Sequence, residues 1–147
     1  MNRAAYEHAL IIGKFYPPHR GHEYLIESAL LHCRRVSVLV LASSAEQLPM
    51  EPRARWLREC FPRAEGLRVI AQLDDVPMDF DDPDIWRAHV AVMRHALDRS
   101  ADERGEREIP IDVVFSSEAY GAELARHFDA AHVCLDRARA LHPVSGT

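Results

Sequence analysis

A lysine and two histidines lie close together in the stretch 13–22, which reads GKFYPPHRGH. An apolar run precedes this stretch, and a pattern typical of an α-helix follows it. A strand that leads through a glycine and two prolines into a helix brings polar groups to the helix N-terminus. Unpaired backbone N–H groups and the positive end of the helix dipole favour an anion there, and Lys14, His19 and His22 add donors. The pattern predicts a phosphate site at the carboxyl end of a first strand.

The order of these residues also resembles a known family. His-Arg-Gly-His at 19–22, after an apolar strand and Gly-Lys-Phe, is similar to the signature of the HxGH nucleotidyltransferase superfamily. The longer string GKFYPPHRGHEYLIESA, residues 13–29, resembles the nicotinamide-nucleotide adenylyltransferase domain of the NadR type, and the resemblance extends with gaps over nearly the whole chain. It implies transfer of an adenylyl group from ATP to nicotinamide mononucleotide, which gives NAD and pyrophosphate.

The resemblance implies that His19 and His22 contact the ATP phosphates and stabilise the charge that develops during transfer. Lys14 lies just beyond the strand and reaches the same anion as a compact point charge. From the residues alone, helix-capping histidines, a metal site and a solvated lysine remain open alternatives, although a metal site would need further ligands. The members of the stretch assigned to substrate binding are Gly13, Phe15 and Gly21, the last because a glycine lets phosphate approach closely.

A second polar group, Ser116-Ser117-Glu118, directly follows an apolar strand pattern, where an α/β sheet presents ligand contacts. Together with Tyr120-Gly121 it matches the Ser-Ser-Glu-x-Tyr-Gly run of the resembling family, which lies near the bound nucleotides. A helix N-cap with Glu118 in the first turn is the alternative, and both readings are compatible. Asp136 follows the next strand and is expected either to bond a ribose hydroxyl or to be a plain loop aspartate.

Trp86 stands near the start of a helical pattern, beside an acidic loop. In the resembling family a tryptophan here stacks on the cationic nicotinamide ring, an interaction worth ~1–2 kcal/mol in a desolvated site. The alternative is a core tryptophan on an amphipathic helix. Arg53 and Trp56 match the family's Arg-x-x-Trp pattern, and we expect them to support the fold or to act on a phosphate at a distance.

The chain ends with Ser145-Gly146-Thr147, which resembles the start of the family's second phosphate motif. In that motif hydroxyl and N–H groups at the start of a helix hold the triphosphate, and a basic residue follows. Because the sequence stops at Thr147, we expect a domain of residues 1–147 cut just after the motif. A frayed polar tail is the alternative.

Composition excludes several classes of protein. The 147 residues suffice for one domain, and a formal charge of −5 argues against broad nucleic-acid binding. Cys33, Cys60 and Cys134 are odd in number and far apart, which argues against a disulfide framework or a zinc cluster. The N-terminal apolar run is too short for a signal peptide or membrane span. We expect a soluble, cytoplasmic protein; the sequence leaves a homo-oligomer open.

Strand patterns alternate with helical patterns, which predicts a parallel sheet with right-handed crossovers and a ligand crevice at its switch point. The helix after residue 83 is expected to end near Asp98, to place Ile85, His89, Val92 and Ala96 on one face, and to be followed by an exposed loop from Ser100 to Glu108. The fold class is therefore α/β, a Rossmann-like doubly wound five-stranded sheet of the HxGH nucleotidyltransferase fold. The expected strands are 9–12, 36–41, 67–73, 111–115 and 131–135, and the expected helices are 23–32, 52–61, 84–98 and 120–128.

The reaction implied by the resemblance needs no dedicated protein cage for magnesium, because the ion arrives with ATP. Two alternatives stay open. The fold could serve another phosphorylated acceptor, as in phosphopantetheine adenylyltransferases or the cytidylyltransferases, or it could be a nucleotide-sensing module with little turnover. No Walker A run occurs in the sequence, so a kinase reaction is not expected of this chain.

Overall fold

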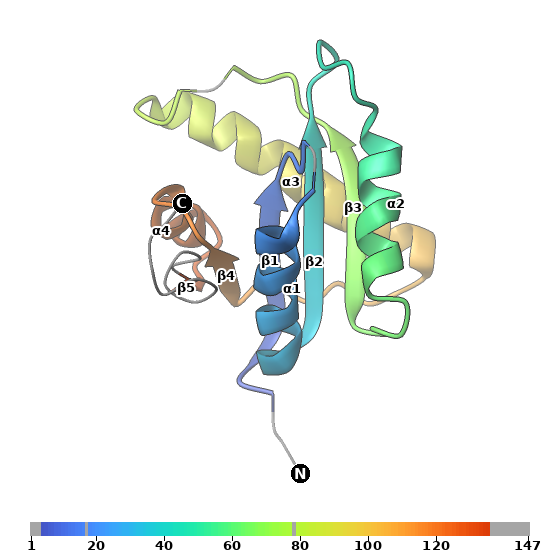
Figure 1. The fold of residues 1–147 in the computed structure, drawn as a ribbon. Helices are drawn as coiled ribbons and strands as arrows, with labels where there is room; N and C mark the ends of the chain where they lie inside the picture. The colour runs from blue at the N-terminus through green and yellow to red at the C-terminus, as the bar shows by residue number, and fades with distance from the viewer. Residues whose placement is uncertain (1–3, 17, 78, 136–147) are drawn as a thin grey trace, which may run out of the picture.

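A computed structural model describes residues 4–16, 18–77 and 79–135 of the chain. Its centre is a sheet of five parallel strands in the order β3-β2-β1-β4-β5 (Figure 1). All five expected strands are present, so the α/β, Rossmann-like doubly wound prediction is confirmed. The strands are β1 (Tyr6–Gly13), β2 (Cys33–Ala42), β3 (Leu67–Leu73), β4 (Val113–Ser116) and β5 (Ala131–Cys134).

Strand β1 lies in the middle of the sheet because its residues are apolar on both faces. It pairs with β2 from Tyr6↔Cys33 to Gly13↔Val40, and on its other side Ala9 and Leu10 pair with Val113 and Val114 of β4. The continuous run Ala9–Ile11 is fully buried, as parallel strands covered on both faces require.

Two layers of helices cover the sheet (Figure 1). Helices α1 (Arg20–His32) and α2 (Met50–Cys60) pack on one face, through Ile26, Ala29 and Leu57 against Val38 and other β-branched residues of β2. Helices α3 (Pro83–Arg104) and α4 (Tyr120–His127) pack on the opposite face. Alternate residues of each strand therefore enter two separate cores.

The order of strands reverses between β1 and β4. The chain leaves β1 through α1 toward β2, whereas it reaches β4 from β3 through α3. Helices that leave neighbouring strands in opposite directions open a crevice at the carboxyl ends of those strands. The predicted switch point therefore exists, and both the turn after β1 and the turn after β4 open onto it.

Helix α3 is longer than predicted. Residues Ser100–Arg104, expected in an exposed loop, continue the helix, and Ser100 is buried. The prediction failed because a charged segment was read as a break, although it contains neither glycine nor proline before residue 105. Gly105 ends the helix in the left-handed conformation, with φ 64°.

The buried face of α3 also differs from the expected one. Trp86, Val90 and Met93 point into the core together with the predicted His89 and Ala96, whereas Ile85 and Val92 are only half-buried. Apolar residues flank the true face on both sides, so the sequence pattern could not distinguish two faces one residue apart.

Strand β4 begins later than predicted, at Val113 rather than at Ile111. Asp112, directly before β4, has two carboxylate oxygens that accept from the backbone N–H groups of Glu7 (3.0 Å) and His8 (2.9 Å), while its own backbone N–H donates to the His8 carbonyl at 3.0 Å. A side chain thus satisfies the N–H groups at the start of β1.

Within the described ranges, none of the helices has the length and apolar character needed to cross a lipid bilayer.

Gly121, in the first turn of α4, has no room for a side chain. A Cβ there would collide with Ser116 Oγ and with the His132 ring.

We expect Gly121→Ala to lower the free energy of unfolding by about 3 kcal/mol, measured by urea denaturation. Gly105→Ala is the control, because a Cβ there meets nothing within 4 Å and adds only left-handed strain of about 1 kcal/mol. A Gly105 variant as destabilised as the Gly121 variant would contradict this packing argument.

Candidate functional site

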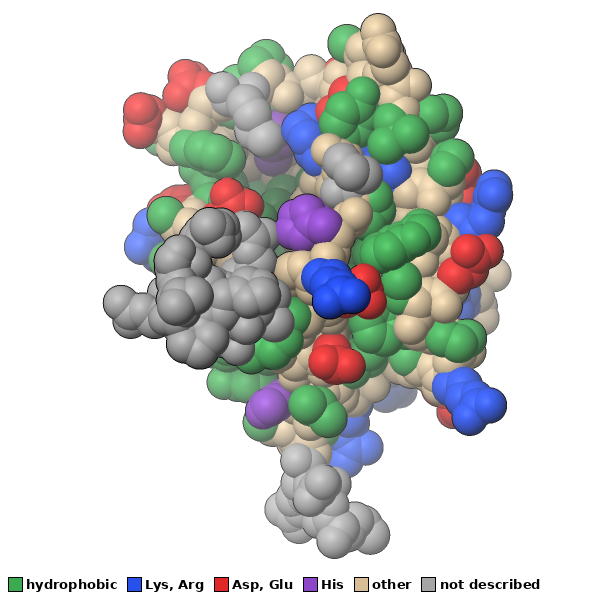
Figure 2. Space-filling model, viewed as in Figure 1, with side chains coloured by type: hydrophobic (Ala, Val, Ile, Leu, Met, Phe, Trp, Pro, Cys, Tyr) green, Lys and Arg blue, Asp and Glu red, His purple; other side chains and the backbone are tan. Residues whose placement is uncertain are grey.

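A cleft of about 900 Å³ lies at the carboxyl ends of the central strands. It is lined by the turn between β1 and α1, the loop between β3 and α3, the turn between β4 and α4, and Leu41 and Ser43 at the end of β2. In Figure 2 acidic side chains gather over the start of α3, and a histidine and basic side chains lie nearer the middle of the same face. The cleft is thus bordered by charges of both signs.

The turn between β1 and α1 is organised by its two histidines. His19 is the N-cap of α1, and its Nδ1 accepts from the backbone N–H of Gly21 at 3.1 Å. In return, Nδ1 of His22 accepts from the backbone N–H of His19 at 3.0 Å. This is a capping box built from imidazoles instead of a hydroxyl and a carboxylate. The two rings are stacked, with centroids 3.7 Å apart.

The capping bonds decide which ring nitrogen carries the proton. Because Nδ1 of each ring accepts a backbone hydrogen bond, the neutral form of each ring carries its proton on Nε2. His19 and His22 therefore present their Nε2–H groups as donors on the side of the ring away from the cap. Both rings line the cleft, so the capping role and the predicted phosphate-binding role are compatible.

Phe15 packs against this turn from the core side. It is buried, adopts a positive φ of 50°, and its ring meets His22 edge-on at 4.5 Å. A Cβ on Gly13 would lie only 3.1 Å from the same ring, so the glycine allows the phenyl group to fold back under the strand end. A positive φ in a bulky residue is uncommon and persists where surrounding contacts stabilise it.

Lys14 is held in an ion pair. Its Nζ lies 2.5 Å from Glu46 Oε2, and Glu46 Oε1 lies 2.9 Å from the guanidinium of Arg53. Burial alone would raise the pKa of Glu46, but the two cations bonded to it hold that pKa below its ordinary value. An anion that binds Lys14 would compete with Glu46, which still retains Arg53 as a partner.

Arg53 is one of the largest fully buried side chains, with 2% of its surface exposed. Its guanidinium donates to the carbonyl oxygens of Lys14 (2.9 Å), Leu48 (2.5 Å) and Pro49 (3.1 Å). It thereby ties helix α2 and the preceding loop to the residue that follows β1. Of the two roles considered for Arg53, the contacts favour support of the fold, and Trp56 is partly exposed.

An aromatic wall, formed by Phe80, Trp86 and Tyr120, stands on the α3 side of the cleft. Phe80 lies 5.4 Å from Trp86 and 6.0 Å from Tyr120 between ring centroids. Trp86 is only 6% exposed, belongs to the α3 core, and stacks on His127 at 5.3 Å. Trp86 is therefore a core residue that also lines the cleft, and its stacking on a nicotinamide ring stays a prediction.

In the turn after β4, only two of the three residues of the Ser-Ser-Glu run line the cleft. Ser117 and Glu118 line the cleft as expected, whereas Ser116 is buried. Ser116 Oγ donates to the Glu118 carbonyl at 3.1 Å and bonds His132 at 2.9 Å, so its side chain shapes the turn.

Tyr120 OH donates to the carbonyl of Ile12 at 3.3 Å, across the switch point. Burial, with a smaller effect of Glu118, raises the pKa of Tyr120, which stays a neutral donor.

The structure thus brings most of the predicted site residues to one cleft. They are Gly13, Lys14, Phe15, His19, Gly21, His22, Trp86, Ser117 and Glu118. Asp136 and Ser145-Gly146-Thr147 lie outside the described residues, and their roles stay predictions. The residues that sequence reasoning missed as parts of the site are Glu46, Asp74, Phe80 and His89; none belongs to a recognisable motif.

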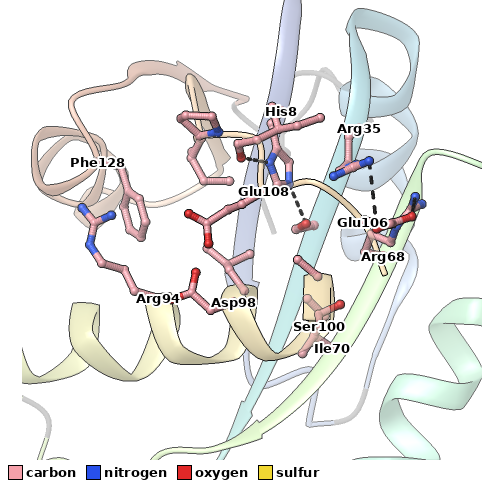
Figure 3. Close-up of a pocket in the computed structure, with 16 residues that line it drawn as sticks. His8, Arg35, Arg68, Ile70, Arg94, Asp98, Ser100, Glu106, Glu108 and Phe128 are labelled. Atoms are coloured by element: carbon pink, nitrogen blue, oxygen red, sulfur yellow. Dashed lines mark hydrogen bonds and ion pairs between the residues drawn. The ribbon is translucent and has the colours of Figure 1, made fainter. Parts of the chain in front are cut away.

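A second, smaller cavity of about 280 Å³ lies at the amino ends of the strands, between the sheet and the second half of α3 (Figure 3). Arg35 and Arg68 share the carboxylate of Glu106 there. His8 is buried in its wall and is hydrogen-bonded through both ring nitrogens. No predicted site residue lines this cavity.

Comparison with known proteins agrees with this geometry. The chain is 28% identical, over 93% of its length, to the trifunctional NAD biosynthesis/regulator protein NadR of Escherichia coli (strain K12), and it spans 34% of that protein. A NadR crystal structure in complex with NAD and AMP-PNP has a TM-score of 0.58 and 21% identity, over 90% of this chain and 39% of that one.

A bifunctional NMN adenylyltransferase/ADP ribose pyrophosphatase from Francisella tularensis, complexed with AMP and a manganese ion, has a TM-score of 0.60 and 16% identity, over 89% of this chain and 37% of that one. No protein-family model matches the chain. Sequence and fold together support a NadR-type nucleotidyltransferase domain. The chain spans about a third of the length of its curated relative, and the matched part contains the whole of the described cleft.

The donors of this cleft are suited to anions. Lysine and Nε2–H imidazole groups donate to phosphate oxygens, whereas magnesium prefers carboxylate, carbonyl and water oxygens. Across the described ranges no group of three or more His, Cys, Asp or Glu side chains is arranged to hold a metal ion.

Because Arg53 holds three carbonyl groups at once, Arg53→Lys should lower the free energy of unfolding by about 2–4 kcal/mol. A lysine keeps the charge but cannot reproduce the planar fork of donors, and it leaves buried carbonyl oxygens unpaired. Urea denaturation measures the loss. The matched control is Arg55→Lys on the exposed side of the same helix, expected within about 0.5 kcal/mol of the wild type. Equal stability of the two variants would show that Arg53 does not hold the turn.

Proposed function

We propose that the chain transfers an adenylyl group from ATP to nicotinamide mononucleotide and forms NAD and pyrophosphate. One observation carries the proposal: the imidazole-capped turn and the aromatic wall line the same cleft of about 900 Å³. The cleft therefore combines anion donors with a surface for a planar ring, at the switch point where α/β sheets bind nucleotides. The relatives support it, because the matched NadR structure was determined with NAD and AMP-PNP.

The proposed reaction needs no general base. The phosphate of a mononucleotide has its second pKa near ~6, so it is already largely ionised at neutral pH. An oxygen of this phosphate attacks the α-phosphorus of ATP in line, the bond to the bridging oxygen of the β-phosphate breaks, and pyrophosphate leaves with the electron pair. One P–O bond forms as one breaks, without a covalent intermediate on the protein.

What the reaction requires is placement of two polyanions and stabilisation of the charge on the departing pyrophosphate. His19 and His22 are proposed to supply Nε2–H donors to the phosphates of ATP, at the positive end of the α1 dipole. Lys14 would turn from Glu46 toward the same phosphates. Because the capping box fixes the two rings before substrate arrives, little reorganisation accompanies the transfer.

Magnesium is proposed to enter as the complex of ATP, held by phosphate oxygens, since the donors of the turn do not suit it. The bound ion would neutralise charge on the leaving pyrophosphate. The matched bifunctional NMN adenylyltransferase/ADP ribose pyrophosphatase structure is complexed with AMP and a manganese ion, which supports a role for a divalent ion.

The aromatic wall is proposed to bind the planar, cationic ring of the acceptor. Phe80 is 53% exposed and offers a larger accessible face than Trp86, so the accessible contact in the cleft is proposed to come chiefly from Phe80. The carboxylate of Glu118 also lines the cleft and favours a cation. Serine and backbone groups of the turn after β4 would complete the nucleotide contacts.

The deciding experiment is detection of dinucleotide products by chromatography. The purified chain is incubated with ATP and magnesium and, in separate reactions, with nicotinamide mononucleotide, nicotinic acid mononucleotide or phosphopantetheine. We expect NAD as the main product. Adenylylation of another acceptor alone would replace the proposed substrate, and binding of ATP without any product, also in a chain extended beyond Thr147, would favour a nucleotide-sensing module.

His19→Asn separates the proposed chemical role of this histidine from its capping role. Asparagine is a strong N-cap and keeps an acceptor for the helix, but it lacks the imidazole donor. We expect the rate of NAD formation to fall about 100-fold or more while the melting temperature stays within a few degrees of the wild type. Normal turnover by this variant would contradict the proposed role of His19.

A further inference from the structure

Residues 74–77 and Phe80, in the loop between β3 and α3, line one wall of the cleft. It begins with a sheet-like bond, in which Asp74 N–H donates to the carbonyl of Ala42 at 2.8 Å. Beyond that point side chains bind it to its neighbours. Asp75, for example, accepts from both the backbone N–H (2.8 Å) and the hydroxyl of Ser44.

His89 of α3 makes two bonds to this loop. Its Nδ1 lies 2.6 Å from Asp74 Oδ2, and its Nε2 lies 2.9 Å from the carbonyl oxygen of Pro77. A backbone carbonyl only accepts hydrogen bonds, so Nε2–H of His89 donates to Pro77, and Nδ1 shares a proton with the Asp74 carboxyl group. Asp74 also accepts from the N–H of Val76 through Oδ1 at 3.0 Å, so both of its oxygens are hydrogen-bonded.

The two side chains form a buried hydrogen-bonded pair. His89 is 8% exposed and Asp74 is 9% exposed, and the pair lies between β3 and α3 in the cleft wall. Removal of one partner would leave a buried polar group of the other without its hydrogen bond, which is costly. The geometry of the loop therefore depends on both members.

Trp86, one turn earlier on α3, acts on the same loop. Its indole N–H donates to the carbonyl of Phe80 at 3.0 Å. Two rings three residues apart on the helix thus bind two carbonyl oxygens three residues apart on the loop, those of Pro77 and Phe80. Phe80, the exposed member of the aromatic wall, is carried by this doubly anchored segment.

We propose that His89 is a positioning residue for the acceptor nucleotide. Through Asp74 and Pro77 it holds the loop that carries Phe80, and so it determines where the planar ring of the acceptor lies. This inference rests on the proposed adenylyl transfer. His89 does not touch the phosphates in this scheme, and it acts on the reaction only through the loop.

The test is steady-state kinetics of the full chain with His89→Gln, varying ATP and nicotinamide mononucleotide in turn. Glutamine is uncharged and its single amide group cannot reproduce both bonds. We expect KM for nicotinamide mononucleotide to rise about tenfold or more, with KM for ATP and kcat within about twofold of the wild type. Unchanged KM for the acceptor would overturn the inference.

The matched control is His8→Gln. His8 is equally buried, at 5% exposure, and also uses both ring nitrogens: Nδ1–H donates to the Ile109 carbonyl (2.6 Å), and Nε2 accepts from the Ser37 hydroxyl (2.7 Å). Burial lowers the pKa of His8, in agreement with this neutral form. It lies in the second cavity (Figure 3), so its loss should reduce stability and leave both KM values unchanged. An equal rise of the acceptor KM in His8→Gln would show a general structural effect and overturn the proposal.

Asp74→Asn is a second variant, for the case that His89→Gln does not fold. It keeps the bond from His89 to Pro77 and replaces the carboxyl group of the pair by an amide, so a smaller rise of the acceptor KM is expected, in the same direction. No change in that KM would also overturn the inference. If the wild-type chain forms no dinucleotide at all, the proposed function fails. An active wild type with unaltered variants disproves only the role of His89.

Discussion

The capping of α1 by its own histidines is the interaction on which the site depends. The first N–H groups of any helix need acceptors, and here the side chains that supply them are the two residues expected to bind phosphate. Capping through Nδ1 directs the Nε2–H donors away from the helix. The Nδ1 side of each ring therefore caps the helix, and the Nε2 side is the one proposed to bind phosphate. The capping bonds hold both rings in place before any ligand binds. Buried Phe15 contacts the His22 ring edge-on and supports it from the core side.

Buried charges fix the surroundings of this turn. Arg53 binds the carbonyl groups of Lys14 and Leu48 and pairs with Glu46, which in turn pairs with Lys14. On the opposite wall His89 and Asp74 form a second buried pair. Each pair connects a helix to a loop that could not be held by apolar packing alone, because loops carry polar backbone groups that need partners. Desolvated ions are costly unless paired, so each network tolerates few arrangements, which keeps the walls of the cleft in place.

The elements with strong periodic patterns were predictable, and those controlled by single contacts were not. Continuous β-branched runs such as 36–41 identified the strands, and their alternation with helices led to the parallel sheet and its switch point. The extent of α3 to Arg104 was missed, because charge does not by itself end a helix. The start of β4 at Val113 rather than at Ile111 was missed because the apolar run 113–115 has no local signal that distinguishes its first paired residue from Ile111. Ser116 was expected in the cleft, but its hydroxyl bonds to Glu118 and His132 inside the turn.

The sequence by itself determined the α/β class and the position of the anion-binding turn, because strand and helix patterns and a helix N-terminus are local properties of the chain. The order of residues also carried the resemblance to the NadR type, since a motif can be recognised in the sequence alone. Only the tertiary structure decided which residues from distant segments meet. The pairing of Asp74 with His89, the bond of Arg53 to the Lys14 carbonyl, and the approach of Phe80 to Tyr120 join residues 15, 39 and 40 positions apart. The physical reason is that these contacts depend on how the helices pack across the sheet, a property of the whole fold.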